Sequence, residues 1–227
     1  MTNSGPLLFF GIFLTLATSW LGMIFFPVAQ LGGAQQETTD KGLYPSPRAG
    51  LAAQGAEVYR ANGCYVCHSQ QVGHPGFGRD FERGWGRRRT VAVDYLWDSP
   101  VMLGDSRLGP DLANFGLRQT NTTPVLLHLY APRAAAPGSA MPSYSYLFEK
   151  RPVASAPSAD ALPLSGEYSP GEGYEVVPRP AAVQLAAYLG SLKSDEWVFE
   201  LPPPEEKKKA TNSVAPVPVA GTNSPKP

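Results

Sequence analysis

Cysteine and histidine are scarce in this sequence. Its 227 residues include two Cys and three His, and Cys64 and Cys67 are the two Cys. A framework of structural disulfides is therefore excluded, and a zinc site of the common four-ligand Cys/His type would need carboxylates to complete it. Excess charge is absent too, because 19 basic and 19 acidic residues give a formal net charge of zero. We therefore expect no binding to nucleic acid through a global electrostatic field.

Charged residues are also missing from a long stretch near the N-terminus. Leu7 to Val28 contains none, and as a helix it would extend about 33 Å, enough to cross the core of a bilayer. A cleaved signal peptide is the alternative, and the small residues at 32–34 would suit cleavage. However, the leader has no Lys or Arg, and the run exceeds the apolar core of a typical signal. We predict an uncleaved anchor over residues 1–34 and a polar linker over residues 35–50.

The rest of the chain is interrupted by proline and glycine, of which there are 24 and 23, so regular structure is expected in short segments. Apolar residues recur at helical spacing from Leu51 until Asn62-Gly63, and again after Pro180. Thr123-Pro124 opens a further helix that runs to Tyr130. We expect the helices that begin near Leu51 and Pro180 to cross and pack against each other.

These helices predict an all-α domain over residues 51–197, without a substantial sheet. Residues 151–178 contain Pro, Ser, Gly and Ala without periodicity, and we expect an irregular insertion there. The segment after Pro202 is rich in Pro and Lys and lacks large apolar residues. The predicted tail, residues 198–227, is therefore expected to be disordered.

The two cysteines belong to the motif Cys64-Tyr65-Val66-Cys67-His68, which is the signature of covalent haem attachment. Thiols separated by two residues can form thioether bonds to the two vinyl groups of a porphyrin, and the next residue places its imidazole under the iron. A thioredoxin-like redox pair would need a strand–turn–helix context, and half of a zinc site would need further thiols. We predict one covalently bound haem c, with His68 as the first axial ligand.

The second axial ligand is less closely defined by the sequence. Met141 lies in a Pro-bounded loop late in the domain, where small c-type domains usually carry this ligand. Met102 is nearer the attachment site and is expected to pack against the porphyrin edge, while His74 is too close to His68 to reach the opposite haem face. His128 lies in an apolar run and remains an alternative. We predict Met141 from this position, and His/Met ligation would raise the reduction potential, as suits an electron carrier.

Two residues between these ligands are expected to support the haem. Pro110 can turn the chain past the imidazole of His68, where a nearby carbonyl would accept its Nδ1–H. Arg107 can pair with a haem propionate. The alternative for both is an ordinary turn with a solvated Arg. A basic cluster follows, interspersed with Phe81 and Trp85. It would dock an acidic partner or lipid headgroups, or it would form a solvated loop. Its members are Arg79, Arg83, Arg87, Arg88 and Arg89.

Four blocks of sequence, in this order, resemble the mono-haem cytochrome c subunit of cbb3-type cytochrome c oxidases, which is subunit II, or CcoO/FixO. They are Gly55 to Gln70 with the Cys motif, Arg107 to Ala113, His128 to Arg133 and Met141 to Tyr144. The resemblance implies that Met141 is the distal ligand and that Arg107 and Pro110 surround the haem. It also implies a catalytic haem–copper oxidase subunit and other cytochrome c subunits as partners. Residues 76–89, the insertion and the tail depart from the family pattern.

The sequence thus predicts a membrane-anchored electron carrier without a catalytic residue of its own. Haem is attached outside the cytoplasmic membrane, so we expect a single-pass protein of the bacterial inner membrane with its haem domain in the periplasm. Electrons would pass to the oxygen-reducing subunit of a terminal oxidase. A nitric oxide reductase or a quinol-oxidising complex is the first alternative. A haem-based gas sensor or a peroxidase-like enzyme is the second, and either would need an open iron site.

Overall fold

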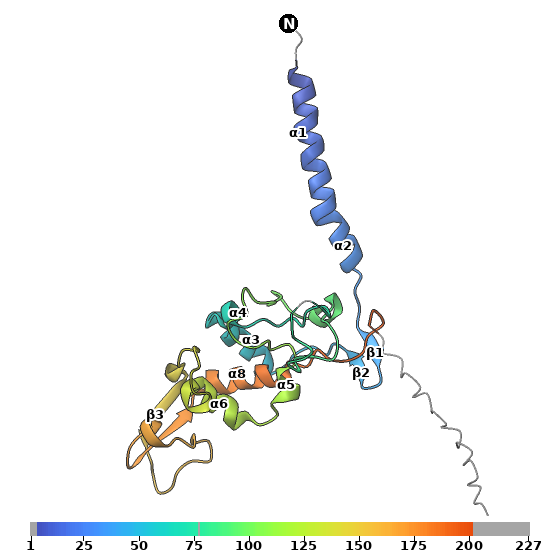
Figure 1. Cartoon of the computed structure of the whole chain (residues 1–227). Coiled ribbons are helices and arrows are strands. Elements are labelled where there is room, and N and C mark those ends of the chain that lie inside the picture. The colour runs from blue at the N-terminus through green and yellow to red at the C-terminus, as the bar shows by residue number, and fades with distance from the viewer. Residues whose placement is uncertain (1–3, 77, 202–227) are drawn as a thin grey trace, which may run out of the picture.

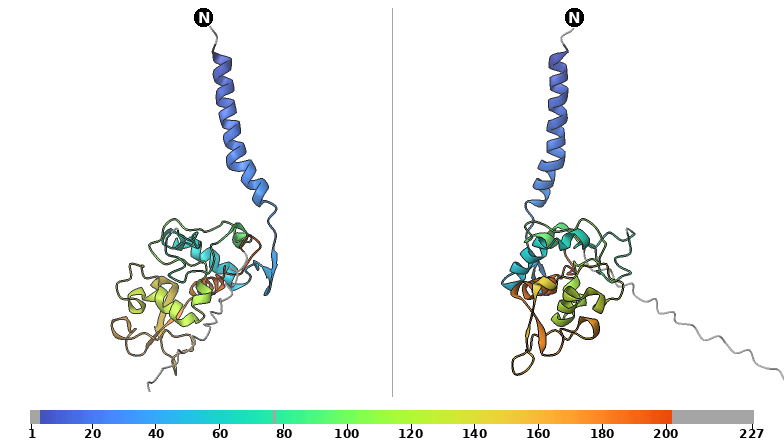
Figure 2. Two further views of the ribbon diagram at one scale, coloured as in Figure 1. Left: turned by 45° about the vertical axis from the view of Figure 1, so that its right-hand side comes forward. Right: turned by 90° about the vertical axis from the view of Figure 1, so that its left-hand side faces the viewer.

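The uncharged N-terminal run forms one continuous helical segment that stands clear of the rest of the chain (Figure 1, Figure 2). The computed structural model describes residues 4–76 and 78–201. The segment consists of α1 (Gly5–Trp20), the π-helical turn η1 (Leu21–Phe25) and α2 (Phe26–Leu31). Among the described residues, this 27-residue segment is the one helix long and apolar enough to cross a membrane, with a mean hydropathy of 2.0. The finding agrees with the predicted span.

The π-helical turn has a local cause in the sequence. Pro27 lies at the start of α2 and has no N–H to donate to the preceding turn. The backbone N–H of Phe26 donates to the carbonyl of Leu21, five residues earlier, which is the pairing of a π-helix. The helix therefore continues through the proline with one widened turn.

The core of the globular part is built around the crossing of α3 (Leu51–Ala61) and α8 (Pro180–Ser191), as predicted. Gly55 makes the close approach possible, because a Cβ on this residue would lie 1.9 Å from the carbonyl oxygen of Gln184. Tyr59 and Tyr188 pack at the crossing with ring centroids 5.2 Å apart, and they are 1% and 0% exposed. The two helices are thereby fixed against each other.

Shorter helices surround this crossing. The chain leaves α3 at Gly63, which has a positive φ of 66° and so ends the helix where the sequence predicted. The helix predicted from Thr123 begins one residue earlier and ends at Tyr130 as expected, and residues 132–135 form one further helical turn. The remaining helical elements are α4 (Cys64–Cys67), η2 (Ala92–Tyr95), α5 (Phe115–Arg118), α6 (Thr122–Tyr130), α7 (Pro132–Ala135), η3 (Ser145–Leu147) and η4 (Gly166–Tyr168).

The expectation of an all-α domain was wrong in part, because the described residues contain two small antiparallel sheets of two strands each. One pairs β3 (Phe148–Pro152) with β4 (Tyr174–Pro178). The predicted irregular insertion, residues 151–178, therefore contains β4 and the end of β3, and residues 153–173 form the loop of a long hairpin. Val176 and Val177 in β4 are both buried. Two consecutive β-branched residues favour a strand, but the Pro and Gly content of the segment led to the prediction of irregular structure. The hairpin lies at the end of the globular part that is remote from the anchor (Figure 1).

The second sheet lies in the predicted linker and pairs β1 (Glu37–Thr39) with β2 (Gly42–Tyr44). This segment is attached to the domain rather than free. Tyr44 is 8% exposed, packs with Val91 and Val93, and donates its hydroxyl to Oδ1 of Asp94 at 2.6 Å. The predicted linker is therefore packed against the domain through the buried side chain of Tyr44.

The predicted tail begins later than expected. Val198 is 4% exposed, packs in the cluster that holds Tyr44, and forms an isolated β-bridge with Leu201. Residues 198–201 therefore belong to the folded domain, because they cover the side chains that attach the linker. The remainder of the predicted tail, residues 202–227, lies outside the described residues.

Candidate haem site

A single helical turn presents both cysteines. The helix α4 begins directly after Gly63 and consists of Cys64–Cys67. Because the two cysteines are three residues apart on one helical turn, their side chains leave from the same face. Cys64 is 9% exposed, and burial raises the pKa of its thiol to about 11. Cys67 is half-buried. The geometry of this turn suits two parallel bonds to one edge of a flat ring.

His68 leaves the helix in an extended conformation and turns its ring toward the segment that contains Gly109 and Pro110. Its Nδ1 lies 2.9 Å from the carbonyl oxygen of Pro110. A carbonyl oxygen only accepts hydrogen bonds, so Nδ1 carries the proton and Nε2 keeps its lone pair for a metal ion. The expected partner carbonyl is therefore the carbonyl of Pro110 itself.

The imidazole of His68 packs directly on the backbone of Gly109. A Cβ on Gly109 would lie 2.3 Å from Cε1 and 2.7 Å from Nδ1 of the ring. The N–H of Gly109 donates to the carbonyl of Cys67 at 2.9 Å, which ties this segment to α4. The sequence Gly-Pro-Asp-Leu was noted for its proline, but the glycine has the equally direct role of making room for the ring.

Beside His68 lies an apolar cavity of about 360 Å³. Met141 is half-buried in its wall, on a loop that is tied to α6 by the N–H of Tyr144, which donates to the carbonyl of Leu129 at 2.9 Å. The structure thus brings His68, Pro110 and Met141 together. The other lining residues are Leu112, Phe115, Gln119, Pro124, Val125, His128, Leu129, Ala135 and Leu189.

The same geometry distinguishes Met141 from most of the other candidates for the second axial ligand. Met102 contributes to a different cavity, of about 250 Å³, together with Arg48 and Trp97. His74 is exposed, with its Nδ1 2.8 Å from the carbonyl of Pro75, and it does not contribute to the wall beside His68. His128 does line that wall, and burial lowers its pKa. Met141 and His128 are therefore the two expected candidates that remain near His68.

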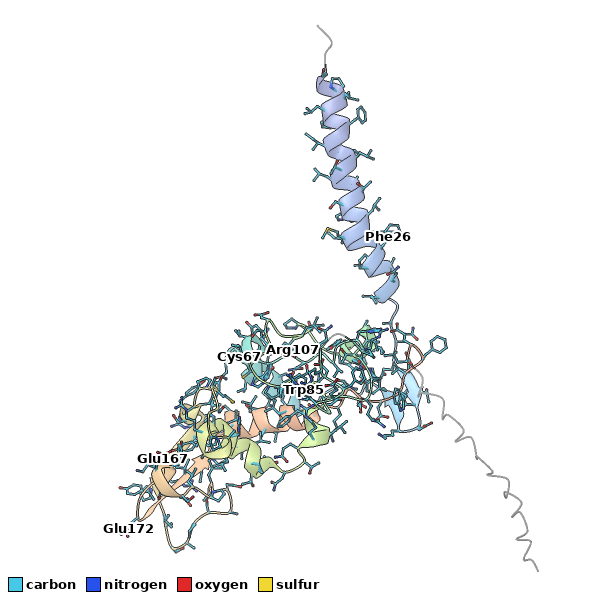
Figure 3. The ribbon with its side chains drawn as sticks, in the orientation of Figure 1. Phe26, Cys67, Trp85, Arg107, Glu167 and Glu172 are labelled. Atoms are coloured by element: carbon cyan, nitrogen blue, oxygen red, sulfur yellow. The ribbon has the colours of Figure 1, made fainter. Side chains whose placement is uncertain are left out.

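Arg107 does not line this cavity. Its guanidinium donates to both carboxylate oxygens of Asp80 at 2.7 and 2.8 Å and lies over the ring of Trp85 at 5.9 Å. In Figure 3, Cys67, Arg107 and Trp85 lie in the part of the domain nearer the anchor, whereas Glu167 and Glu172 lie at the remote end. Arg107 therefore pairs with a buried carboxylate, and its pairing with a haem propionate stays a prediction.

One member of the basic cluster, Arg88, is buried and Arg89 is half-buried, whereas Arg79, Arg83 and Arg87 are exposed. The exposed members leave both expectations open, a docking surface or a solvated loop. Arg88 is buried against Asp94 at 2.6 Å, and Arg87 pairs with Asp195 at 2.6 Å. Arg79 pairs with Glu82, and Arg83 lies over Trp85 at 4.8 Å. The pair Arg79–Glu82 is local, because its residues are three positions apart, whereas Arg87 and Asp195 are brought together only by the tertiary fold.

The donor set and the cavity fit a c-type haem. Two thiols on one helical turn, an imidazole with a free Nε2 and a thioether sulfur are the groups that hold such a haem. Groups of three or more His, Cys, Asp or Glu arranged to hold a metal ion were not found among the described residues.

Comparison with protein families agrees with this chemistry. The family of the mono-haem cytochrome c oxidase subunit, FixO, matches residues 7–162, more than half of the chain. The chain belongs to the FixO family. No individual curated protein is similar enough in sequence to count as a relative. As a FixO protein, the chain is a haem-carrying subunit of a cytochrome c oxidase complex, which implies a catalytic oxidase partner. The match runs from the N-terminal helix to the loop of the β3–β4 hairpin.

Proposed function

We propose that this FixO protein is a membrane-anchored mono-haem cytochrome c that passes single electrons to the oxygen-reducing subunit of a cbb3-type oxidase. One observation carries the proposal: His68 and Met141 line the same apolar cavity, beside the turn that presents Cys64 and Cys67. A cytochrome needs two axial ligands and two attachment points around one flat group. The described residues supply all four at one place.

Each side chain has a separate task in this proposal. The sulfurs of Cys64 and Cys67 hold the haem covalently, Nε2 of His68 binds the iron and Sδ of Met141 is the distal ligand. A haem held in this way exchanges one electron between its ferric and ferrous states. Leu112, Val125 and Leu189 form an apolar wall that excludes water, and this keeps the site closed to other chemistry. Arg107 would contribute indirectly, by holding Asp80 in place.

The helical segment Gly5–Leu31 is proposed as a retained anchor in the bacterial inner membrane. Its length and its full exposure support this role, because nothing within the described chain covers its apolar side chains. The haem domain would then lie in the periplasm, where haem is attached. We propose an anchor over residues 1–34, a docked linker over residues 35–50 and a cytochrome domain that extends from residue 51 to residue 201.

The docked linker would place the haem at a fixed position relative to the membrane. Tyr44 and Arg48 attach it to the domain through Asp94 and Asp98, respectively. The indole N–H of Trp97 donates to the carbonyl of Pro45 at 2.9 Å and adds a third attachment. A short, fixed connection suits a carrier that serves one membrane-embedded partner, because that partner's acceptor is then always within reach.

Purification of the intact complex in mild detergent tests this function. We expect a catalytic haem–copper subunit and further cytochrome c subunits to co-purify, and mass analysis to find this chain with its anchor and one covalent haem. Co-purification with the subunits of a nitric oxide reductase or a quinol-oxidising complex would contradict the proposed partner. A mature start near residue 34 would contradict the anchor, and carbon monoxide binding to the ferrous chain at neutral pH would contradict six-coordinate ligation.

A further inference from the structure

A buried carboxylate joins the two segments that meet at the proximal histidine. Asp111 is 0% exposed. Its Oδ2 accepts hydrogen bonds from the hydroxyl of Ser69 and from the N–H of Gln71, both at 2.7 Å. Its Oδ1 accepts from the N–H of Ala113 at 2.9 Å. All three bonds use the side chain as an acceptor, which is the role of an ionised carboxylate.

The charge of Asp111 is not neutralised by a directly bound cation. The salt bridges of residues 4–76 and 78–201 do not include it. Arg118 lies nearby, but its guanidinium donates to the main-chain carbonyl of Asp111 rather than to the carboxylate. Burying a charge in this way is costly unless donors surround it. The three hydrogen bonds to the carboxylate of Asp111 offset this cost and hold the side chain in one position.

The position of Asp111 indicates what that role is. Ser69 directly follows His68, and Pro110, whose carbonyl accepts the Nδ1–H of His68, directly precedes Asp111. The hydrogen bonds that Ser69 and Gln71 donate to the carboxylate therefore hold the segment that follows His68 against the segment that follows Pro110. The N–H of Leu112 adds a parallel bond to the carbonyl of Ser69 at 2.8 Å.

We propose that Asp111 is a positioning residue that sets the reduction potential of the haem through His68. By fixing the hydrogen bond between His68 and Pro110, it keeps the imidazole electron-rich, and an electron-rich ligand favours ferric iron. Its own buried charge acts in the same direction, because a nearby negative charge stabilises the more positive ferric state. The inference rests on the proposed function, since it requires His68 to ligate the iron.

Asp111→Asn in the full-length, haem-loaded protein tests this role. The amide keeps the shape of the side chain, but in either orientation its NH₂ group faces a donor, so at least one of the three bonds is lost. We expect the potential to rise by about 59 mV, equivalent to a tenfold change in the equilibrium constant for reduction of a one-electron couple. In the NMR spectrum of the ferric protein, the Nδ1–H of His68 should exchange with solvent faster than in the wild type.

Glu175→Gln is the matched control. Glu175 is also buried, at 6% exposure, and accepts from Arg151 and from the N–H of Ser158 at 2.8 and 2.7 Å, but it lies in the β3–β4 hairpin. This variant should leave the potential and the exchange rate unchanged. If Asp111→Asn behaves like Glu175→Gln in both measurements, the inference is wrong.

Two further outcomes are decided by the same experiment. If Asp111→Asn does not retain haem, Ser69→Ala decides, because it removes one bond to the carboxylate and keeps the charge. Faster exchange of the Nδ1–H of His68 in Ser69→Ala would support the proposed positioning role of Asp111, and an unchanged rate would overturn it. A wild-type chain without covalent haem would overturn the proposed function and this inference together, whereas a normal cytochrome with an unaffected Asp111→Asn variant would overturn the inference alone.

Discussion

Gly109 supports the imidazole of His68 with its bare backbone, and a Cβ at this position would lie 2.3 Å from Cε1 of the ring. The contact leaves no room for a side chain of any kind. Because Pro110 follows directly and accepts the Nδ1–H of His68 at 2.9 Å, displacement of the ring would also break that hydrogen bond. The position of the proximal ligand therefore depends on a glycine that carries no chemistry of its own.

Gly109→Ala should displace the ring of His68 and weaken its bond to the iron. We expect a lower yield of haem-loaded protein and loss of the six-coordinate low-spin signal, measured by absorption and electron paramagnetic resonance of the ferric protein. Gly190→Ala in α8 is the control, because a Cβ there meets nothing within 4 Å. Normal low-spin spectra from Gly109→Ala would show that the ring tolerates the displacement.

Met141→Ala should abolish the weak sulfur-to-iron absorption at the red end of the ferric spectrum, because Met141 is the methionine in the cavity beside His68. Met102→Ala should retain this band, since Met102 lies in the wall of a different cavity. The spectra of both variants and of His128→Ala are compared with that of the wild type. Loss of the band in Met102→Ala but not in Met141→Ala would show that Met102, and not Met141, is the distal ligand.

Asp94→Asn should destabilise the domain by about 3 kcal/mol or more, because it leaves the buried guanidinium of Arg88 without its counter-charge. The side chains of this pair are 2% and 0% exposed, and their closest contact is 2.6 Å. Urea unfolding followed by tryptophan fluorescence measures the change. Glu82→Gln, which breaks the exposed pair with Arg79, should cost less than about 1 kcal/mol. Equal effects of the two variants would contradict the structural role of Arg88.

Glu175→Gln should weaken the β3–β4 hairpin in a pH-dependent way. The N–H of Ser158 and then the guanidinium of Arg151 lower the pKa of Glu175. Because the folded pKa lies below the unfolded one, the stabilisation is present above the ordinary pKa of a glutamate and is lost as the pH falls through the folded value. Urea unfolding at about pH 7 and about pH 3 should therefore show a larger difference between variant and wild type at the higher pH.

Glu149→Gln provides the control for this pH dependence. Glu149 lies opposite Val177 in the same hairpin and is exposed. Its replacement should have little effect at either pH, because an exposed side chain on a strand makes few contacts. A pH-independent loss of stability in Glu175→Gln would indicate that packing, rather than the charge of Glu175, holds the hairpin.

Several features of the fold could be predicted from the sequence because their causes are local. Apolar spacing defined the helices that begin at Leu51 and Pro180, and Gly63 ended the first of them through its left-handed backbone conformation. The β3–β4 hairpin was missed for the opposite reason. Its strands pair Phe148 with Pro178, which are 30 positions apart in sequence, and such pairing depends on the partner strand rather than on either segment alone.

The sequence by itself determined the motif that predicts haem attachment, because Cys64, Cys67 and His68 lie within five consecutive residues and their predicted chemistry depends on spacing along the chain. It also determined the long apolar helix, whose hydropathy is a local property. Only the tertiary structure decided which charged groups are partners: Arg107 with Asp80, Arg88 with Asp94, and Asp111 with the backbone beyond His68. Charges interact through space, and burial determines how strong these interactions are. Neither the partner of a charged group nor the strength of the pair can therefore be read from the order of residues along the chain.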